Sequence, residues 1–288
     1  MRILFTIAHF FNPDIKGKHG SQRKDPRCRL LALSRSLAAL HQLFGKSQSM
    51  INIGQQLAFP VNQPQVYDLD IIICTSKNNH FLNQLPLPSH FYKHHPTQAE
   101  SLMLGFECQS LLRDCLGKYD YYCFLEDDLI LHDPWLFIKL NWFTQQAGNL
   151  TLLQPNRYEI STHNLTCKAY IDGDLAPKLT ANFQNVNQKP QIRGIIMGMP
   201  ITFRRTLNPH AGCYFLNANQ MDNWANQPYF LDRDTSFVSP LESAATLGIM
   251  KTFWVYKPAP EQANFLEIQH FGTGFLSLIG QQVGLSAS

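Results

Sequence analysis

The hydrophobic positions in the first half of the chain form short apolar runs that alternate with longer segments of helical periodicity. Runs rich in Ile, Leu, Phe and Tyr predict buried strands at residues 2–11, 70–75, 121–125 and 150–154. An apolar residue at every third or fourth position predicts helices at residues 26–45, 97–117 and 133–148. This alternation is typical of an α/β fold with a mostly parallel central sheet and helices on both faces.

Turn-forming residues set the limits of these elements. Asp25-Pro26 predicts the start of the first helix and Gly45 its end. The spacing of Thr97 and Glu100 predicts a capping box at the second helix. Two segments are predicted to be irregular, namely the Gln- and Asn-rich residues 46–65 and the proline-containing residues 80–96.

The second half of the chain, from about residue 150, has a less regular pattern. A polar stretch at residues 178–191 precedes an apolar run at 212–216 that predicts a strand. Ser239-Pro240 predicts the start of a helix, which Gly248 is expected to end. A last strand is expected at residues 267–270.

Composition narrows the class of protein. The net charge of +3 is too small to predict a nucleic-acid partner. No apolar run has the length of a membrane span, and the run at residues 2–11, interrupted by His9, predicts a strand rather than a signal peptide. The seven cysteines form no CxxC pair and indicate a reducing compartment. These features favour a cytoplasmic protein.

Three consecutive carboxylates, Glu126-Asp127-Asp128, directly follow the predicted strand 121–125. Adjacent carboxylates repel one another, and a divalent cation would relieve that repulsion. Mg²⁺ or Mn²⁺ suits carboxylate oxygens and commonly bridges to substrate phosphates. The alternative is an acidic loop that caps the next helix, although Asp133 is available for that role.

This arrangement resembles the GT-A class of glycosyltransferases, in which an acid-x-acid motif ends a hydrophobic strand. The resemblance extends from Met1 to about Thr273 and implies that Asp128 contacts the metal directly. It also implies that Glu126 and Asp127 contact the donor, or reach the metal through water. The first acid is Glu rather than Asp, which departs from the commonest form of the motif.

The resemblance implies a single domain, residues 1–288, with a nucleotide-sugar-binding half at about 1–150 and an acceptor-binding half at about 151–288. The expected donor is a nucleotide-diphospho-sugar, with a UDP-sugar favoured. The expected acceptor is a hydroxyl of a glycan or of a lipid-linked molecule, which would bring a peripheral contact with a membrane. No nucleic acid is expected to bind.

In inverting members of this class, an acidic residue at the start of a late helix deprotonates the acceptor. Glu242 falls at that position, three residues after Ser239. A carboxylate suits the task because the attacking hydroxyl must lose a proton. The same spacing also fits a capping box, and Asp232 and Asp234 are competing candidates for the base.

The resemblance also implies that a late histidine completes the metal site. His270 ends the predicted strand 267–270 and is the candidate, since imidazole and carboxylate together suit Mn²⁺. The alternative is a partly buried, hydrogen-bonded side chain.

Residues at the ends of the other strands are candidates for substrate contact. His9 and Thr75 follow the first two strands and are expected to line the donor site. Arg27, in a basic segment with Arg23, Lys24 and Arg29, would neutralise a diphosphate, unless the segment is only a solvated charged face. Gly212 and Cys213 are small enough to let an acceptor sugar approach the backbone, although a core strand explains them equally well.

Two other functions use similar features. A nucleotidyltransferase would need a glycine-rich phosphate loop, of which Gly17 and Gly20 form a poor version. A non-catalytic protein would bind the nucleotide sugar without turnover. His90, His94 and His95 are interpreted as loop residues rather than as a metal cluster, because the flanking prolines prevent a helix that would align them.

Overall fold

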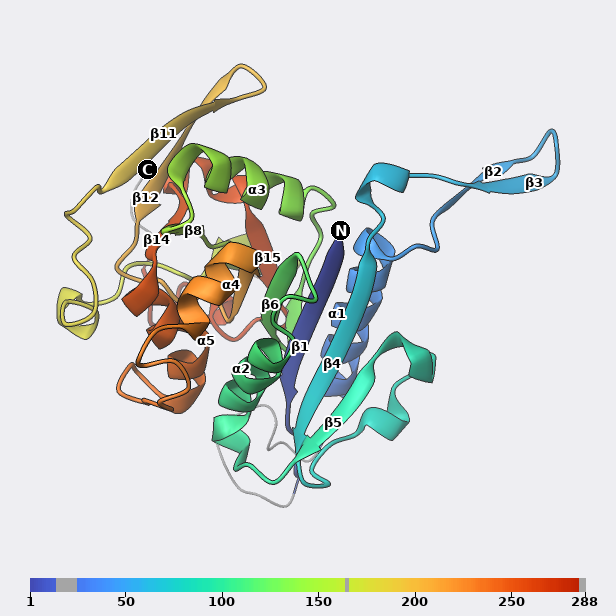
Figure 1. Ribbon diagram of the computed structural model, residues 1–288, viewed down its shortest axis with the longest axis horizontal. Coiled ribbons are helices and arrows are strands. Elements are labelled where there is room, and N and C mark those ends of the chain that lie inside the picture. Colours follow the sequence, from blue (N-terminus) through green and yellow to red (C-terminus); the bar gives the residue numbers. More distant parts are fainter. Residues whose placement is uncertain (14–24, 164–165, 285–288) are drawn as a thin grey trace.

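The computed structural model describes residues 1–13, 25–163 and 166–284. Its centre is a five-stranded sheet in the order β13-β6-β1-β4-β5 (Figure 1). The strands are β1 (Arg2–His9), β4 (Asp68–Ser76), β5 (Lys93–Thr97), β6 (Tyr121–Glu126) and β13 (Cys213–Asn217). The first four are parallel, and β13 pairs antiparallel with β6. The prediction of an α/β fold around a mostly parallel sheet is therefore confirmed.

Helices cover both faces of this sheet. Successive strand residues point to opposite faces, so neighbours in β1 belong to different apolar clusters. Phe5 packs in one cluster with Leu37 of α1 (Arg27–Phe44), whereas Leu4 packs in the other with Cys108 of α2 (Leu104–Asp114). This double burial explains the continuous apolar run of β1.

The described residues also form two four-stranded sheets and further α-helices. The four-stranded sheet β10-β9-β15-β7 contains β7 (Leu129–Ile130), β9 (Asn156–Ile160), β10 (Lys168–Tyr170) and β15 (Glu267–His270). The sheet β11-β12-β14-β8 contains β8 (Thr151–Leu153), β11 (Gln191–Ile196), β12 (Met199–Arg205) and β14 (Trp254–Pro258). The helices are α3 (Leu136–Ala147), α4 (Ala218–Ala225) and α5 (Pro240–Thr252). Strands of both halves of the chain pair with one another.

The prediction that residues 46–65 are irregular is wrong. They form a hairpin of β2 (Ser49–Asn52) and β3 (Leu57–Pro60), which projects from the body of the molecule (Figure 1). The turn depends on Asn52, whose side-chain oxygen accepts a hydrogen bond from the backbone N–H of Gln55. Asn commonly closes turns in this way, so the polar composition that predicted a loop instead marks the turn.

The prediction of a loop over residues 80–96 is wrong at its end, where β5 pairs with β4 as an edge strand. A proline such as Pro96 is tolerated at an edge because its missing N–H faces away from the ladder. The predicted capping box is also wrong. Thr97 ends β5 and donates a hydrogen bond to the backbone oxygen of Thr75, and α2 begins only at Leu104.

Helix α5 does not end at Gly248 as predicted but continues to Thr252. The glycine is needed for packing, because a Cβ there would lie 2.8 Å from the indole nitrogen of Trp224. That indole is buried, so it has little room to move. Gly248 thus permits the close approach of α4, which carries Trp224, to α5.

We predict that Gly248→Ala lowers the free energy of unfolding by about 1–3 kcal/mol, because the added methyl group overpacks this contact. Urea unfolding measures the change. Gly54→Ala, at the exposed tip of the β2–β3 hairpin, meets only ordinary van der Waals contacts and is the control. An unchanged or higher stability of Gly248→Ala would contradict this explanation of the glycine.

Candidate functional site

The acidic triplet lies where the parallel strands β1 and β6 end side by side. Ala8 is the register partner of Glu126, so the next residues, His9 and Asp127, lie side by side at the ends of the two strands. The Nδ1 atom of His9 lies 2.6 Å from Oδ2 of Asp127, and both side chains are buried. The hydrogen bond fixes the middle carboxylate of the triplet to the first strand.

Arg29, in the first turn of α1, supplies a positive charge to two of the three carboxylates. Its Nη1 donates to Oδ2 of Asp128 at 2.7 Å, and its Nη2 donates to Asp127. Burial opposes ionisation of Asp127, but Arg29 and His9 outweigh it and lower the pKa of Asp127. Arg29 and His9 therefore relieve part of the repulsion between the carboxylates, which from the sequence alone a bound cation was expected to relieve.

Arg27 does not reach these carboxylates. It pairs with Asp25 at the surface, and its side chain is 85% exposed. Residues two positions apart on a helix point in nearly opposite directions, which explains why Arg29 faces the site and Arg27 does not. The other residues of the predicted basic segment and of the poor glycine-rich loop lie outside the described residues, namely Arg23, Lys24, Gly17 and Gly20.

Glu126 has a different environment from its neighbours. Burial and the nearby carboxylates of Asp128 and Glu242 raise its pKa to about 7, against the opposing effect of Arg157. The backbone of Gly212 lies directly against it, and a Cβ on this glycine, whose φ is +62°, would lie 2.5 Å from Oε2 of Glu126. Gly212 is thus required for close backbone approach, and the group it approaches in this structure is Glu126.

His270 is held next to Asp128 by the pairing of β15 with β7, in which it is opposite Leu129. Its Nδ1 lies 2.8 Å from Oε1 of the buried Glu159. Burial opposes ionisation of Glu159, but hydrogen bonds from His270 and two backbone N–H groups lower its pKa, so the carboxylate accepts the Nδ1 proton. The other ring nitrogen, Nε2, lies 3.8 Å from Oδ2 of Asp128.

The donor chemistry of this pair suits a divalent cation. A carboxylate that fixes Nδ1 of a histidine, leaving Nε2 for a metal, is a common arrangement behind metal ligands. Among the described residues, no group of three or more His, Cys, Asp or Glu side chains is placed to hold a metal ion. An ion at Asp128 and His270 would therefore take its remaining ligands from substrate phosphates and water, as Mg²⁺ and Mn²⁺ often do.

Glu242 lies at the N-terminus of α5, close enough to Glu126 for its charge to raise the pKa of that residue. The predicted alternative, a capping box, does not form: the Ser239 hydroxyl donates to the Glu242 carboxylate, and Ser239 makes no side-chain bond to the helix backbone. Asp234 pairs with Lys251 at 2.9 Å, and Asp232 lies 3.9 Å from the same ammonium.

Two other residues that were predicted to contact substrate, Thr75 and Cys213, are buried inside the protein. Thr75 is buried, and its hydroxyl lies 2.8 Å from Nε2 of His94 in β5. Cys213 is buried at the start of β13. His94 and His95 belong to β5 rather than to a loop, whereas His90 lies in a 3₁₀ turn before it.

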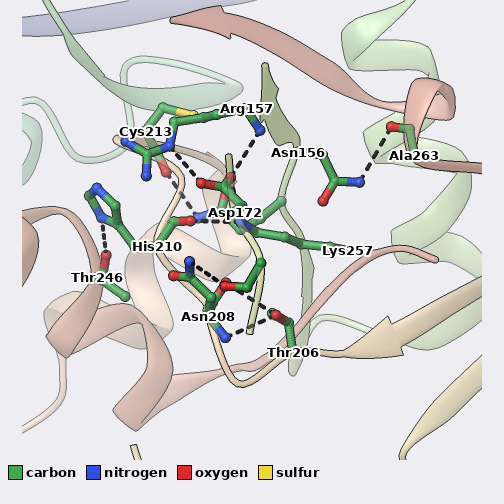
Figure 2. A network of polar contacts seen from close by, with 12 residues as sticks. Asn156, Arg157, Asp172, Thr206, Asn208, His210, Cys213, Thr246, Lys257 and Ala263 are labelled. Atoms are coloured by element: carbon green, nitrogen blue, oxygen red, sulfur yellow. Dashed lines mark hydrogen bonds and ion pairs between the residues drawn. The ribbon is translucent and has the colours of Figure 1, made fainter. Parts of the chain in front are cut away.

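A buried network of polar contacts around Asp172 joins residues of β9, β14 and α5 (Figure 2). Asp172 accepts from Nζ of Lys257 at 2.8 Å and from Nε of Arg157 at 2.9 Å. Lys257 also donates to the backbone oxygen of His210 at 2.6 Å, and the ring of His210 bonds to Thr246 of α5. The network positions His210, whose Nε2 lies 4.0 Å from Glu126.

Sequence reasoning missed this network and Glu159. One signal was available, because Lys257 is a charged residue inside the apolar run of β14 (Trp254–Pro258), and a buried charge requires a partner. Asp172 lies in a segment without strand or helix periodicity, and nothing in its local sequence marks it as that partner. The pairing depends on residues 85 positions apart in the chain.

No protein-family model matches this chain, and no curated protein matches it. Among solved structures, it is similar to a mycobacterial protein at 11% identity, with a TM-score of 0.46 over 96% of this chain and 70% of the other. It is similar to CMP-2-keto-3-deoxy-manno-octonic acid synthetase complexed with CTP, at 11% identity and a TM-score of 0.36 over 90% and 91%. It is also similar to mouse xyloside xylosyltransferase 1, at 11% identity and a TM-score of 0.39 over 88% and 80%.

We predict that Asp172→Asn lowers the free energy of unfolding by about 3–5 kcal/mol near neutral pH, because two buried cations lose their counter-charge. Lys257 and Arg157 outweigh burial and lower the pKa of Asp172 in the folded state. Its contribution is therefore present above the unfolded pKa of about 3.9 and is lost as the pH falls below it.

Denaturant unfolding at several pH values measures this effect. The difference between wild type and Asp172→Asn should shrink toward acid pH. Asp174→Asn is the matched control, because Asp174 is partly exposed, pairs with Arg204 at 3.3 Å and should cost about 1 kcal/mol or less. If the two substitutions lowered the free energy of unfolding equally, the buried network would stabilise the fold no more than a surface ion pair does.

Proposed function

We propose that this protein is a metal-dependent glycosyltransferase of the GT-A class that uses a nucleotide-diphospho-sugar. The observation that carries the proposal is the convergence of Asp128, His270 and Arg29 at the carboxyl ends of β1 and β6. Ligands of open α/β sheets bind at such strand ends. A carboxylate, an imidazole and a guanidinium together match a divalent cation and a diphosphate.

Asp128 and His270 would hold Mn²⁺ or Mg²⁺, which neutralises charge on the diphosphate leaving group. Arg29 pairs with Asp127 and Asp128 in this structure, and a guanidinium group can bind phosphate oxygens as well as carboxylates. Arg29 therefore has two roles in the proposal. It balances the triplet before the donor binds, and it contacts the diphosphate afterwards.

Glu242 would act as the base. The acceptor hydroxyl oxygen forms a bond to the anomeric carbon of the donor while the bond from that carbon to the diphosphate oxygen breaks. The hydroxyl proton passes to the Glu242 carboxylate, and the nucleoside diphosphate leaves. This single displacement inverts the configuration at the anomeric carbon. The Ser239 hydroxyl, bonded to Glu242, orients the carboxylate.

The favoured donor is a UDP-sugar, and the acceptor is a hydroxyl of a glycan or a lipid-linked molecule. The test is a panel of nucleotide sugars with Mn²⁺, scored for release of nucleoside diphosphate with and without simple sugar acceptors. The proposal predicts metal-dependent release with at least one donor. Nucleotide binding without release from any donor would instead support a non-catalytic binding protein.

With an active donor in hand, we predict that Glu242→Gln lowers kcat by about 10²- to 10⁴-fold with little change in donor KM, because the amide cannot accept the proton. Asp232→Asn is the control, since Asp232 is the competing candidate and lies near Lys251. A larger loss in Asp232→Asn than in Glu242→Gln would transfer the role of base to Asp232.

We also predict that Asp128→Asn weakens Mn²⁺ binding by at least about 10-fold, because even the loss of a group behind a metal ligand costs about that much. Electron paramagnetic resonance of free Mn²⁺, without nucleotide, measures the binding. Asp133→Asn is the matched control, because Asp133 pairs with Lys139 at 2.6 Å and should leave Mn²⁺ binding within twofold of wild type. Mn²⁺ binding that survives in Asp128→Asn would exclude Asp128 as a metal ligand.

A further inference from the structure

A cavity of about 340 Å³ lies between helix α1 and strands β7 and β15. Helix α1 is the longest helix of the described residues, and like the others it is not long and apolar enough to cross a membrane. Its residues Arg35, Ala38 and Gln42 line one side of the cavity, and Ile130 and Gln269 of the two strands line the other. The volume is within the range of small-ligand sites and equals about eleven waters of about 30 Å³ each.

The cavity is separate from the candidate metal site, although β15 contributes to both. In the pairing of β15 with β7, Gln269 is opposite Ile130 and His270 is opposite Leu129. Because adjacent strand residues point to opposite faces, Gln269 and His270 project from different faces of β15. His270 faces Asp128, whereas Gln269 lines the cavity. A ligand in the cavity would therefore contact the reverse face of the strand that holds His270.

The side-chain amide of Gln269 offers hydrogen-bond donors to this cavity. Gln269 is only 8% exposed, and its Oε1 lies 2.8 Å from Nε2 of His132, so the oxygen accepts the ring N–H. The amide nitrogen has no partner among the described residues, and it is not fully enclosed by protein atoms. A nearly buried donor without an acceptor lowers stability, and a ligand oxygen would remove that cost. The amide nitrogen thus marks where a ligand oxygen fits.

Arg35 adds a positive charge at the rim. Its guanidinium carbon lies 5.6 Å from the centre of the Phe271 ring, a distance typical of a cation–π contact. Within the part of the chain that the structure describes, Arg35 forms no ion pair with an acidic side chain. Phe271 is two residues after Gln269, so the guanidinium and the amide approach the same end of the cavity. Donors and one unpaired cation at that end favour an anionic group.

The charge of one guanidinium distinguishes between two kinds of anion. A carboxylate has a single negative charge, and its two oxygens match the fork of an arginine. A phosphate monoester has a charge of about −1.5 to −2 at neutral pH, which Arg35 alone would not balance. The cavity is therefore better matched to a carboxylate.

The inner part of the cavity is apolar. Ile130 and Leu131 are buried and line it, together with Leu43 of α1. Two small side chains on α1, Ala38 and Ala39, leave the space open. These residues have no polar side-chain atoms for the hydroxyls of a sugar. A hydrocarbon chain would instead displace water from them, and each buried CH₂ group would strengthen binding by about fourfold.

We propose that this cavity binds a small carboxylic acid with an unbranched apolar chain. The carboxylate accepts hydrogen bonds from Arg35 and from the amide of Gln269. The chain lies against Ile130, Leu131 and Ala38. None of these residues belongs to the candidate glycosyltransferase site, so the proposal goes beyond the proposed function.

Isothermal titration calorimetry of the full chain with hexanoate tests the proposal. Hexanoate should bind at least about tenfold more tightly than hexanol, which lacks the charge, and than acetate, which lacks the chain. Arg35→Gln should weaken hexanoate binding at least about tenfold, and Ala38→Phe should abolish it by filling the cavity. Arg113→Gln is the matched control, because Arg113 is an exposed arginine on α2 that pairs with Asp114 at 2.8 Å, and it should bind hexanoate like wild type.

Any of four results would overturn the proposal: no binding of hexanoate by the wild type, equal affinities for hexanoate and hexanol, wild-type affinity in both Arg35→Gln and Ala38→Phe, or tighter binding of glucuronate than of hexanoate. The last result would assign the cavity to an acidic sugar. Mn²⁺ binding by Arg35→Gln and Ala38→Phe should equal that of wild type, which separates this test from that of the proposed function.

Discussion

The contact on which the site depends is the placement of Asp127 between His9 and Arg29. A carboxylate that is only 5% exposed would strongly disfavour its charged form without such partners. His9 ends β1, Arg29 lies in the first turn of α1, and Asp127 directly follows β6. The contact therefore links the first strand, the first helix and the central strand at one point, and it leaves Asp128 facing outward toward His270.

A second layer of charge supports the first. Asp172, Lys257 and Arg157 form a buried charge network, and Lys257 bonds to the backbone oxygen of His210, whose ring lies near Glu126. Strand β15 and helix α5 add His270 and Glu242 from the second half of the chain. The three acidic residues thus have distinct environments. Asp127 bonds to His9 and Arg29, which lower its pKa, Asp128 faces His270, and Glu126 has a pKa raised to about 7.

Local pattern predicted the elements in which burial is continuous. The strands β1, β4 and β6 are mostly apolar and buried, so their sequence alone marks them and the triplet at the end of β6. The β2–β3 hairpin has exposed apolar residues among Asn and Gln, and edge strand β5 contains a proline, so neither has that signal. To predict that Arg29 rather than Arg27 faces the triplet, one must know how α1 is oriented about its own axis. To predict the ion pairs of Asp172, one must know its tertiary contacts. A single sequence shows neither.

The most direct measurement of the central claim is a crystal structure of the protein with Mn²⁺ and uridine diphosphate. We predict one ion bound by Asp128 and His270, with the diphosphate on that ion and near Arg29. A nucleotide bound away from the carboxyl ends of β1 and β6 would contradict it. So would an ion that contacts neither Asp128 nor His270.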